Sequence, residues 1–393
     1  MSRLRTCVAG PLFLAVCFVA ASAEPTDVGP LLQRLKAVGK EGAGAAEAAT
    51  ALRELSRCQA NVLPVVLAAL DDATPEAANW LRSAVEVIAD QNLAAGKPLP
   101  AQDLEKFVRD TRHEARARRL AFELLTRVDN SAADRLLPGM LQDPSLELRR
   151  DAVARLIKEA DAAKGKNDKE TARQVYERAF AGARDKDQID LLAKELKALG
   201  AEVDIARHLG FVRSWQVLGP FDSTGGVGFA AVYDPERGVD LQKEFTGKGG
   251  AKLRWKPHVS VDAYGTVDLN KAIGKHMGAA GYAYAVVESA DERPVEIRAG
   301  SNNAVKIWLN GKELVSHEEY HHGTRMDQYV GVGKLRPGKN EVLIKVCQNE
   351  QKEEWAQSWG FQLRICDRVG TAVPVVVAQW SPAAKPTTGE KNP

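Results

Sequence analysis

The spacing of apolar residues changes near residue 208, and this change constrains the fold more than any other feature of the chain. Before it, apolar side chains recur at the spacing of one helix face, as Ile189, Leu192 and Leu196 do. After it, short runs alternate apolar and polar residues, which is the period of a half-buried strand. Six of the seven tryptophans and six of the seven tyrosines also follow residue 208. The sequence therefore predicts a helical domain over residues 24–208 and an antiparallel β-domain over residues 209–380.

Three segments of the helical region can be superposed. They are Leu81–Val85, Arg118–Phe122 and Arg149–Val153, and their aligned alanines are 37 and then 31 positions apart. Each segment follows a turn that contains Asp, which is typical of a repeat of paired helices. The pattern resembles HEAT repeats, and this resemblance implies an α-solenoid that presents a surface to a protein partner. An irregular helical bundle with coincidental spacing is the alternative.

A hairpin signal lies at the centre of the β region. Val305, Ile307 and Leu309 alternate with polar or larger residues, and Asn310-Gly311 then supplies two residues that tolerate the positive φ of a type I′ turn. Further strands are expected over the runs Ser214–Leu218, Lys252–Val259, Tyr282–Glu288, Val295–Ala299, Ala304–Leu309, Asp327–Val332, Asn340–Cys347 and Gly360–Cys366. Short strands separated by turn signals predict an antiparallel β-sandwich.

The hairpin residues also carry a resemblance. The segment KIWLNGKELV is similar to the hairpin of galactose-binding-like jelly-roll domains that accompany glycosidases, and GSNNAVKIWLNGK resembles protective-antigen-type sandwich domains. The second resemblance would imply a calcium site at paired aspartates. Here these positions are Asn302 and Asn303, and the later aspartate is Asn310. Because calcium sites require negative ligands, calcium binding is not carried over.

The two ends of the chain predict export and a disordered tail. Arg3 and Arg5 precede a short apolar run, and Ala21-Ser22-Ala23 fits a cleavage site, so residues 1–23 are interpreted as a signal peptide cleaved after Ala23. The expected location is therefore periplasmic or extracellular, without a membrane span in the mature chain. Residues 381–393 lack apolar periodicity and are expected to be disordered.

Charge and cysteine content limit the partners. Removing the signal leaves 52 basic against 52 acidic residues, a balance that argues against a nucleic-acid partner. Cys347 and Cys366 both lie on expected strands, so they form either a disulfide, as an oxidising compartment allows, or two free thiols. Cys58 lies in a helical pattern and is expected to be a buried small side chain.

Aromatic residues supply the candidate ligand site. Trp308 points opposite to the core residues of its strand, so it faces outward or into a second layer, and Trp355 lies in a polar loop. Exposed indoles stack on sugar rings, and neighbouring polar groups bind hydroxyls. The candidate ligand-binding residues are Trp308, Tyr320, His322, Arg325 and Trp355. Alternatively, the tryptophans cover the edge of the sandwich or pack on the helices.

The histidines next to the hairpin are the candidate metal ligands. His317, His321 and His322 lie beside two glutamates, but loop spacing does not make imidazoles converge, so no metal site or cofactor is expected. Recognised enzyme motifs and catalytic residues are also absent from the sequence.

Three functions remain open at this stage. The favoured one is a non-catalytic extracytoplasmic interaction scaffold with a protein partner. The first alternative is a carbohydrate-binding module that recognises a glycan on the sandwich. The second is an enzyme of the cell envelope or of polysaccharide processing, for which a glycosidase would need two carboxylates across a cleft.

Overall fold

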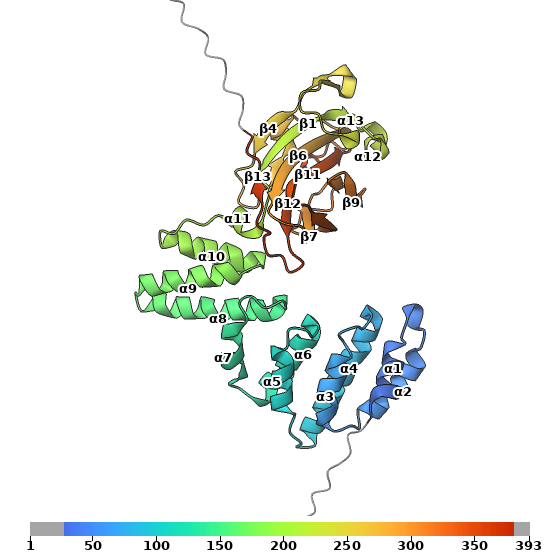
Figure 1. Cartoon of the computed structure of the whole chain (residues 1–393), viewed down its shortest axis with the longest axis vertical. Helices are drawn as coiled ribbons and strands as arrows, with labels where there is room; N and C mark the ends of the chain where they lie inside the picture. The colour runs from blue at the N-terminus through green and yellow to red at the C-terminus, as the bar shows by residue number, and fades with distance from the viewer. Residues whose placement is uncertain (1–26, 381–393) are drawn as a thin grey trace, which may run out of the picture. The chain divides into compact units, whose positions relative to one another are not determined.

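The chain is helical in its first part and contains antiparallel sheets in its second. The computed structural model describes residues 27–380, so the predicted signal peptide and tail lie outside the described residues. Helices run from Gly29 to Leu209 and strands from Ser214 to Val377 (Figure 1), which confirms the change near residue 208. Over residues 27–380, no helix is long and apolar enough to span a bilayer. The chain divides into two compact units between Arg135 and Leu136.

The first unit consists of short amphipathic helices joined by turns. They are α1 (Gly29–Lys36), α2 (Ala45–Leu55), α3 (Leu63–Ala68), α4 (Pro75–Ala94), α5 (Ala101–Arg109), α6 (Ala115–Val128) and α7 (Ala132–Leu136). Thr74 caps α4, because its side chain accepts a hydrogen bond from the Ala77 N–H and Pro75 fits the first helical turn. Ala84 and Ala121 are fully buried, as the close approach of helices requires.

Ion pairs connect helices that lie about one helix pair apart in the first unit. Lys36 bonds to Asp72, 36 residues away, and Arg127 bonds to Asp90, 37 residues away, with an N–O distance of 2.6 Å. Both carboxylates are largely exposed, so solvent screening leaves these pairs with little effect on stability. The pairs show which segments are neighbours. The end of α1 lies beside the turn before α4, and α4 lies beside α6.

The second unit begins with four helices and continues into the sheets. The helices are α8 (Leu146–Gly165), α9 (Lys169–Gly182), α10 (Lys186–Ala198) and α11 (Ile205–Leu209), and the first three lie side by side (Figure 1). Their apolar faces share a core that also includes Phe211, with Tyr264 packed against it. The Tyr264 hydroxyl donates to Asp190 at 2.5 Å, and the Arg364 guanidinium donates to the Leu209 carbonyl at 3.1 Å. The helices and the sheets of this unit are therefore packed together.

The larger sheet has the strand order β4-β1-β6-β11-β8-β9, with β13 paired to β6, and the smaller has the order β10-β7-β12-β5. The bounds are β1 (Ser214–Asp222), β4 (Lys256–Val259), β5 (Val267–Asp268), β6 (Ala279–Ser289), β7 (Arg293–Gly300), β8 (Ala304–Leu309), β9 (Lys312–His317), β10 (Tyr329–Leu335), β11 (Gly338–Gln348), β12 (Gly360–Cys366) and β13 (Val376–Val377). Every pair is antiparallel, as predicted, and the two sheets enclose one apolar core.

The predicted hairpin is confirmed. Leu309 pairs with Lys312, and the two residues between them have positive φ, 53° at Asn310 and 79° at Gly311. Val305 and Ile307 face the core between the sheets. By contrast, the single strand expected over Lys252–Val259 is divided into β3 (Lys252–Leu253) and β4, because β3 leaves the large sheet to pair with β2 (Phe245–Thr246).

A covering layer lies on the outer face of the larger sheet. Residues 223–255 form it, with the short helices α12 (Val227–Ala230) and α13 (Asp234–Arg237) and the β2–β3 pair. Phe229, Phe245 and Trp255 from this layer pack against Tyr282 and Trp308 of the sheet. The strands β1, β6, β11 and β8 of the larger sheet are consequently covered on both faces.

A buried ammonium group fastens the covering layer to the sheet. Lys345 on β11 has no exposed side-chain surface, and its Nζ donates to Glu236 at 2.8 Å, to the Ala231 carbonyl at 2.6 Å and to the Phe229 carbonyl at 3.2 Å. Tyr282 donates its hydroxyl to the same carboxylate at 2.5 Å. All three ammonium protons are therefore used, and the role of Lys345 is structural.

Candidate functional site

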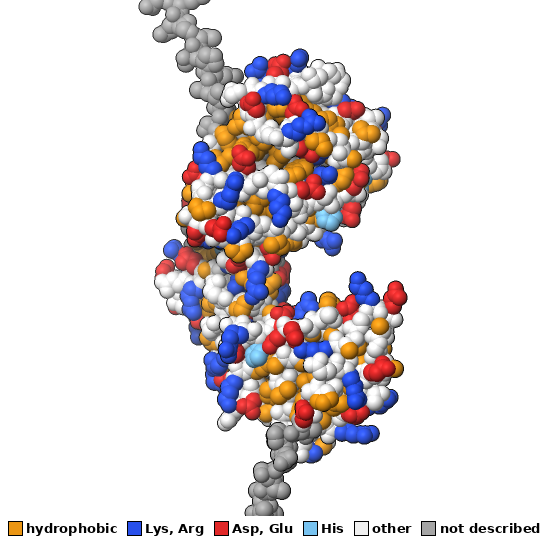
Figure 2. All heavy atoms as spheres, turned by 45° about the vertical axis from the view of Figure 1, so that its right-hand side comes forward, with side chains coloured by type: hydrophobic (Ala, Val, Ile, Leu, Met, Phe, Trp, Pro, Cys, Tyr) orange, Lys and Arg blue, Asp and Glu red, His pale blue; other side chains and the backbone are white. Residues whose placement is uncertain are grey.

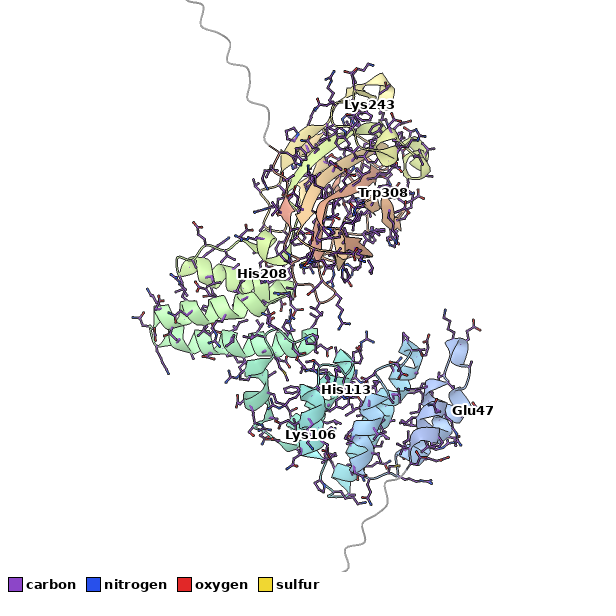
Figure 3. All side chains as sticks on the ribbon, viewed as in Figure 1. Glu47, Lys106, His113, His208, Lys243 and Trp308 are labelled. Atoms are coloured by element: carbon purple, nitrogen blue, oxygen red, sulfur yellow. The ribbon has the colours of Figure 1, made fainter. Side chains whose placement is uncertain are left out.

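Trp308 lies beneath the covering layer. Only 8% of the residue is exposed, and its indole packs in the apolar cluster between β8 and residues 223–255 (Figure 3). The sequence predicts that this side chain faces either solvent or a second layer. In the structure it faces the second layer, which residues 223–255 form. Its ring is thus covered in the structure, away from solvent.

The exposed indole of the candidate set belongs to Trp355. It lies on a single 3₁₀ turn, Glu354–Ala356, and 63% of the residue is exposed. The edge of its ring meets the ring of His321, with centroids 5.3 Å apart and planes at 86°, and the ring of Tyr320 lies 6.2 Å from that of His321. We call Tyr320, His321 and Trp355 the loop platform.

Hydrogen bonds hold the loop platform in place. The His321 N–H donates to the Asn302 carbonyl at 2.6 Å, and its Nε2 lies 2.8 Å from Asn349 Oδ1. Two buried polar atoms of the platform, the Tyr320 hydroxyl and His321 Nδ1, have no hydrogen-bond partner within residues 27–380. Buried polar groups are normally paired, so these two atoms are exceptions, and neither reaches the surface that the Trp355 ring presents.

His322 belongs to a neighbouring group. Its Nε2 lies 2.6 Å from the Tyr329 hydroxyl and 3.6 Å from a carboxylate oxygen of Glu319, and the ring of His317 stacks on Tyr329 with centroids 4.6 Å apart. The pKa of Tyr329 is raised to about 12, mainly by burial and to a lesser extent by the negative charge of Glu319. The phenol therefore stays neutral at physiological pH.

Arg325 follows on the same loop and is exposed. Its backbone N–H donates to Gln328 at 3.3 Å. The structure thus places Tyr320, His322 and Arg325 on one loop, and the ring of His321 on this loop contacts Trp355 on another. Trp308 lies in the buried layer.

The three histidines next to the hairpin do not converge on one point. His317 and His322 contact Tyr329, whereas His321 contacts Asn349 and Trp355. Across the described residues, no group of three or more His, Cys, Asp or Glu side chains converges as metal ligands.

The asparagines that stand where the resemblance would require aspartates serve the fold. Asn303 is fully buried, donates to Gln348 Oε1 at 2.6 Å and accepts the Gly360 N–H at 3.1 Å. Asn310 accepts the Glu341 N–H at 3.0 Å. These amides connect the loops internally and use both donor and acceptor atoms, which carboxylates could not do.

Sequence reasoning missed the contacts that support the platform from the neighbouring loops. Lys248 Nζ lies 3.2 Å from Asp222, 3.0 Å from the Thr224 hydroxyl and 2.5 Å from the Gly278 carbonyl. Glu350, on the loop that carries Trp355, accepts the Gly225 N–H. The glycine-rich stretch at residues 225–228 is the sequence signal that could have marked this position.

The three cysteines within residues 27–380 are not activated as nucleophiles. Cys58, Cys347 and Cys366 are free thiols, and the last two lie on different sheets. Burial raises the pKa of Cys347 to about 12 and that of Cys366 to about 11. Both thiols therefore remain protonated at neutral pH, whereas the thiolate is the reactive form.

Charges are mixed on the surface. On the face shown in Figure 2, Lys and Arg side chains alternate with Asp and Glu on each unit, and no broad patch of one sign is seen. The loop that carries Trp355 is itself mixed, because Lys352 accompanies Glu353 and Glu354.

Comparisons with known proteins identify no family. No family model matches the chain, and no curated protein matches it. Among solved structures, part of the chain is similar to a GH31 alpha-xylosidase from Xanthomonas citri, with 12% identity and a TM-score of 0.17. The match covers 29% of this chain and 15% of that chain.

Proposed function

We propose that the protein is a non-catalytic, exported interaction protein and that the loop platform binds its ligand. The exposed indole of Trp355 carries the proposal. An aromatic residue exposed to this extent on a protein that buries most of its other tryptophans is typical of a recognition surface, and tryptophan is among the residues that contribute most to binding.

A glycan is the ligand class that the platform fits best. The indole of Trp355 offers a flat, exposed apolar face on which a sugar ring can stack. His322 and Arg325, on the loop that carries His321, add exposed hydrogen-bond donors for sugar hydroxyls. A jelly-roll-like sandwich with its ligand at loops is the finer architecture that accompanies this proposal.

Glycan-array binding of the full chain tests the proposal. Trp355→Ala should weaken binding at least tenfold, because removal of a central aromatic contact costs about 2 kcal/mol or more. Trp355→Phe should retain part of the affinity. Val261→Ala is the matched control, since Val261 is also exposed but lies outside the platform. Undiminished binding by Trp355→Ala would exclude the platform as the site.

A second candidate function is a protein-binding surface on the first unit. The ion pairs that join residues 36 and 37 positions apart support stacked HEAT-like repeats, which present extended surfaces to partners. A photo-crosslinker at the exposed position of Arg116 on α6, compared with one at Trp355, separates the two functions. If a purified binding protein is crosslinked from position 116 and not from position 355, the result would favour the helical surface.

A further inference from the structure

Strand β10 is an open edge of the smaller sheet. It pairs with β7 over its whole length, from Tyr329 to Leu335, and β7 lies on one side of it only. Within residues 27–380, the backbone of β10 makes no hydrogen bond outside this ladder. Val330 and Val332 are 49% and 69% exposed. A seven-residue edge with exposed valines is able to accept another strand.

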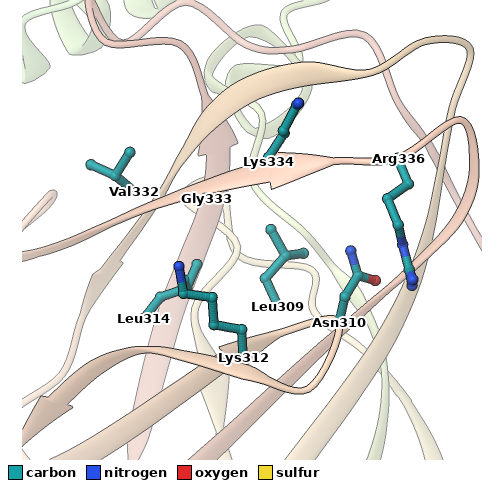
Figure 4. Close-up of a pocket in the computed structure, with 8 residues that line it drawn as sticks. All are labelled: Leu309, Asn310, Lys312, Leu314, Val332, Gly333, Lys334 and Arg336. Atoms are coloured by element: carbon teal, nitrogen blue, oxygen red, sulfur yellow. The ribbon is translucent and has the colours of Figure 1, made fainter.

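A pocket opens beside this edge. It has a volume of about 420 Å³ and lies between β9 and β10, with Leu309 and Leu314 as its apolar floor (Figure 4). Gly333 allows β10 to approach this floor, because a Cβ atom there would lie only 2.8 Å from Leu309 and 2.9 Å from Leu314. A volume of this size accommodates a bulky side chain.

Basic residues surround the pocket. Lys312, Lys334 and Arg336 contribute to its lining (Figure 4). Lys334 pairs with Glu292 at 2.5 Å, whereas Lys312 and Arg336 form no ion pair in the described part of the chain. Two unpaired cations beside an apolar floor complement a segment that carries negative charge next to an apolar side chain.

We propose that the edge of β10 binds an extended, acidic peptide segment of a partner protein by strand addition. The backbone of the peptide would pair with the free side of β10. Side chains on one face of a strand are two residues apart, or about 7 Å. An apolar side chain would therefore enter the pocket, and acidic side chains two residues before and after it would lie near Lys312 and Arg336.

This second binding surface uses none of the residues of the loop platform. The pocket residues come from β8, the hairpin turn, β9, β10 and the turn after β10, whereas Trp355 lies on the loop that precedes β12. The proposal therefore stands or falls separately from glycan binding.

The test uses the full chain and a fluorescein-labelled peptide, Thr-Glu-Thr-Val-Thr-Glu-Thr, in which valine and both glutamates share one face. Fluorescence anisotropy should show saturable binding that weakens as ionic strength rises. The double variant Lys312→Glu/Arg336→Glu should bind at least tenfold more weakly. Lys339→Glu is the matched control, because it reverses an exposed charge on β11 outside the pocket and should leave affinity unchanged.

Hydrogen exchange identifies the mode of binding. Saturation with the peptide should protect the alternate amides of residues 329–335 that point away from β7, because pairing would engage the free backbone groups of β10. Equal affinity for a scrambled peptide, or for the double charge variant, would overturn the proposal. A chain that already forms a dimer with β10 protected in the absence of peptide would also overturn it, since a second copy would then occupy the edge.

Discussion

The buried ion pair between Lys345 and Glu236 provides the sharpest stability prediction. Lys345→Met removes an ammonium group that makes three hydrogen bonds, and it leaves the Glu236 carboxylate with the Tyr282 hydroxyl and a backbone N–H. The carboxylate then remains buried without a counter-charge, because its side chain is only 8% exposed.

The expected loss in the free energy of unfolding is about 4 kcal/mol, since breaking a buried pair by removal of one partner typically costs about 3–5 kcal/mol. Removing both charges should cost less than removing one. Lys345→Met/Glu236→Leu is accordingly expected to recover part of the loss, because the second substitution eliminates the uncompensated charge.

Guanidinium unfolding followed by tryptophan fluorescence measures this effect, because six of the seven tryptophans lie after residue 208 and report on the β region. Lys339→Glu serves as the control for a change of surface charge. A loss below about 1 kcal/mol for Lys345→Met, or a double variant that loses the sum of the single effects, would contradict the proposed role of the pair.

Two further predictions concern titration and thiol chemistry. Burial alone would raise the pKa of Asp327, but Arg364 and then Arg298 outweigh it and hold that pKa below its usual range. Stability from this carboxylate is therefore present above about pH 4 and is lost as the pH falls through the lowered pKa, so Asp327→Asn should be less stable at pH 7 and show a flatter acid limb in unfolding titrations. Because Cys347 and Cys366 are buried with raised pKa values, at most Cys58 should react with a thiol reagent at pH 8 in a protein that begins at residue 24, before guanidinium is added. Rapid modification of more than one thiol in this folded protein would contradict their burial.

Local chemistry made part of the fold predictable. Asn310-Gly311 defined a hairpin because few residue pairs tolerate positive φ at both turn positions. The stripe Ile189, Leu192 and Leu196 defined a helix because its spacing places these side chains on one face, and all three are buried. Such signals are contained within a few neighbouring residues.

The candidate site was less predictable because it depends on distant segments. Alternation placed Trp308 opposite to the core residues of its strand, but it does not reveal what covers that face of the sheet. Residues 223–255 do so, and their turns and short helices carry no strong period. The contrast between covered Trp308 and exposed Trp355 arises from this long-range packing.

The shared core of the second unit has a practical consequence for fragment design. Phe211 and Tyr264 contribute to the apolar core of α8–α11, and Arg364 bonds to the last turn of α11. A recombinant fragment that starts at residue 209 would expose these aromatic rings to water and would be prone to aggregate. Expression from residue 136 onward retains their covering and is the better choice for crystallisation or NMR of the sheets.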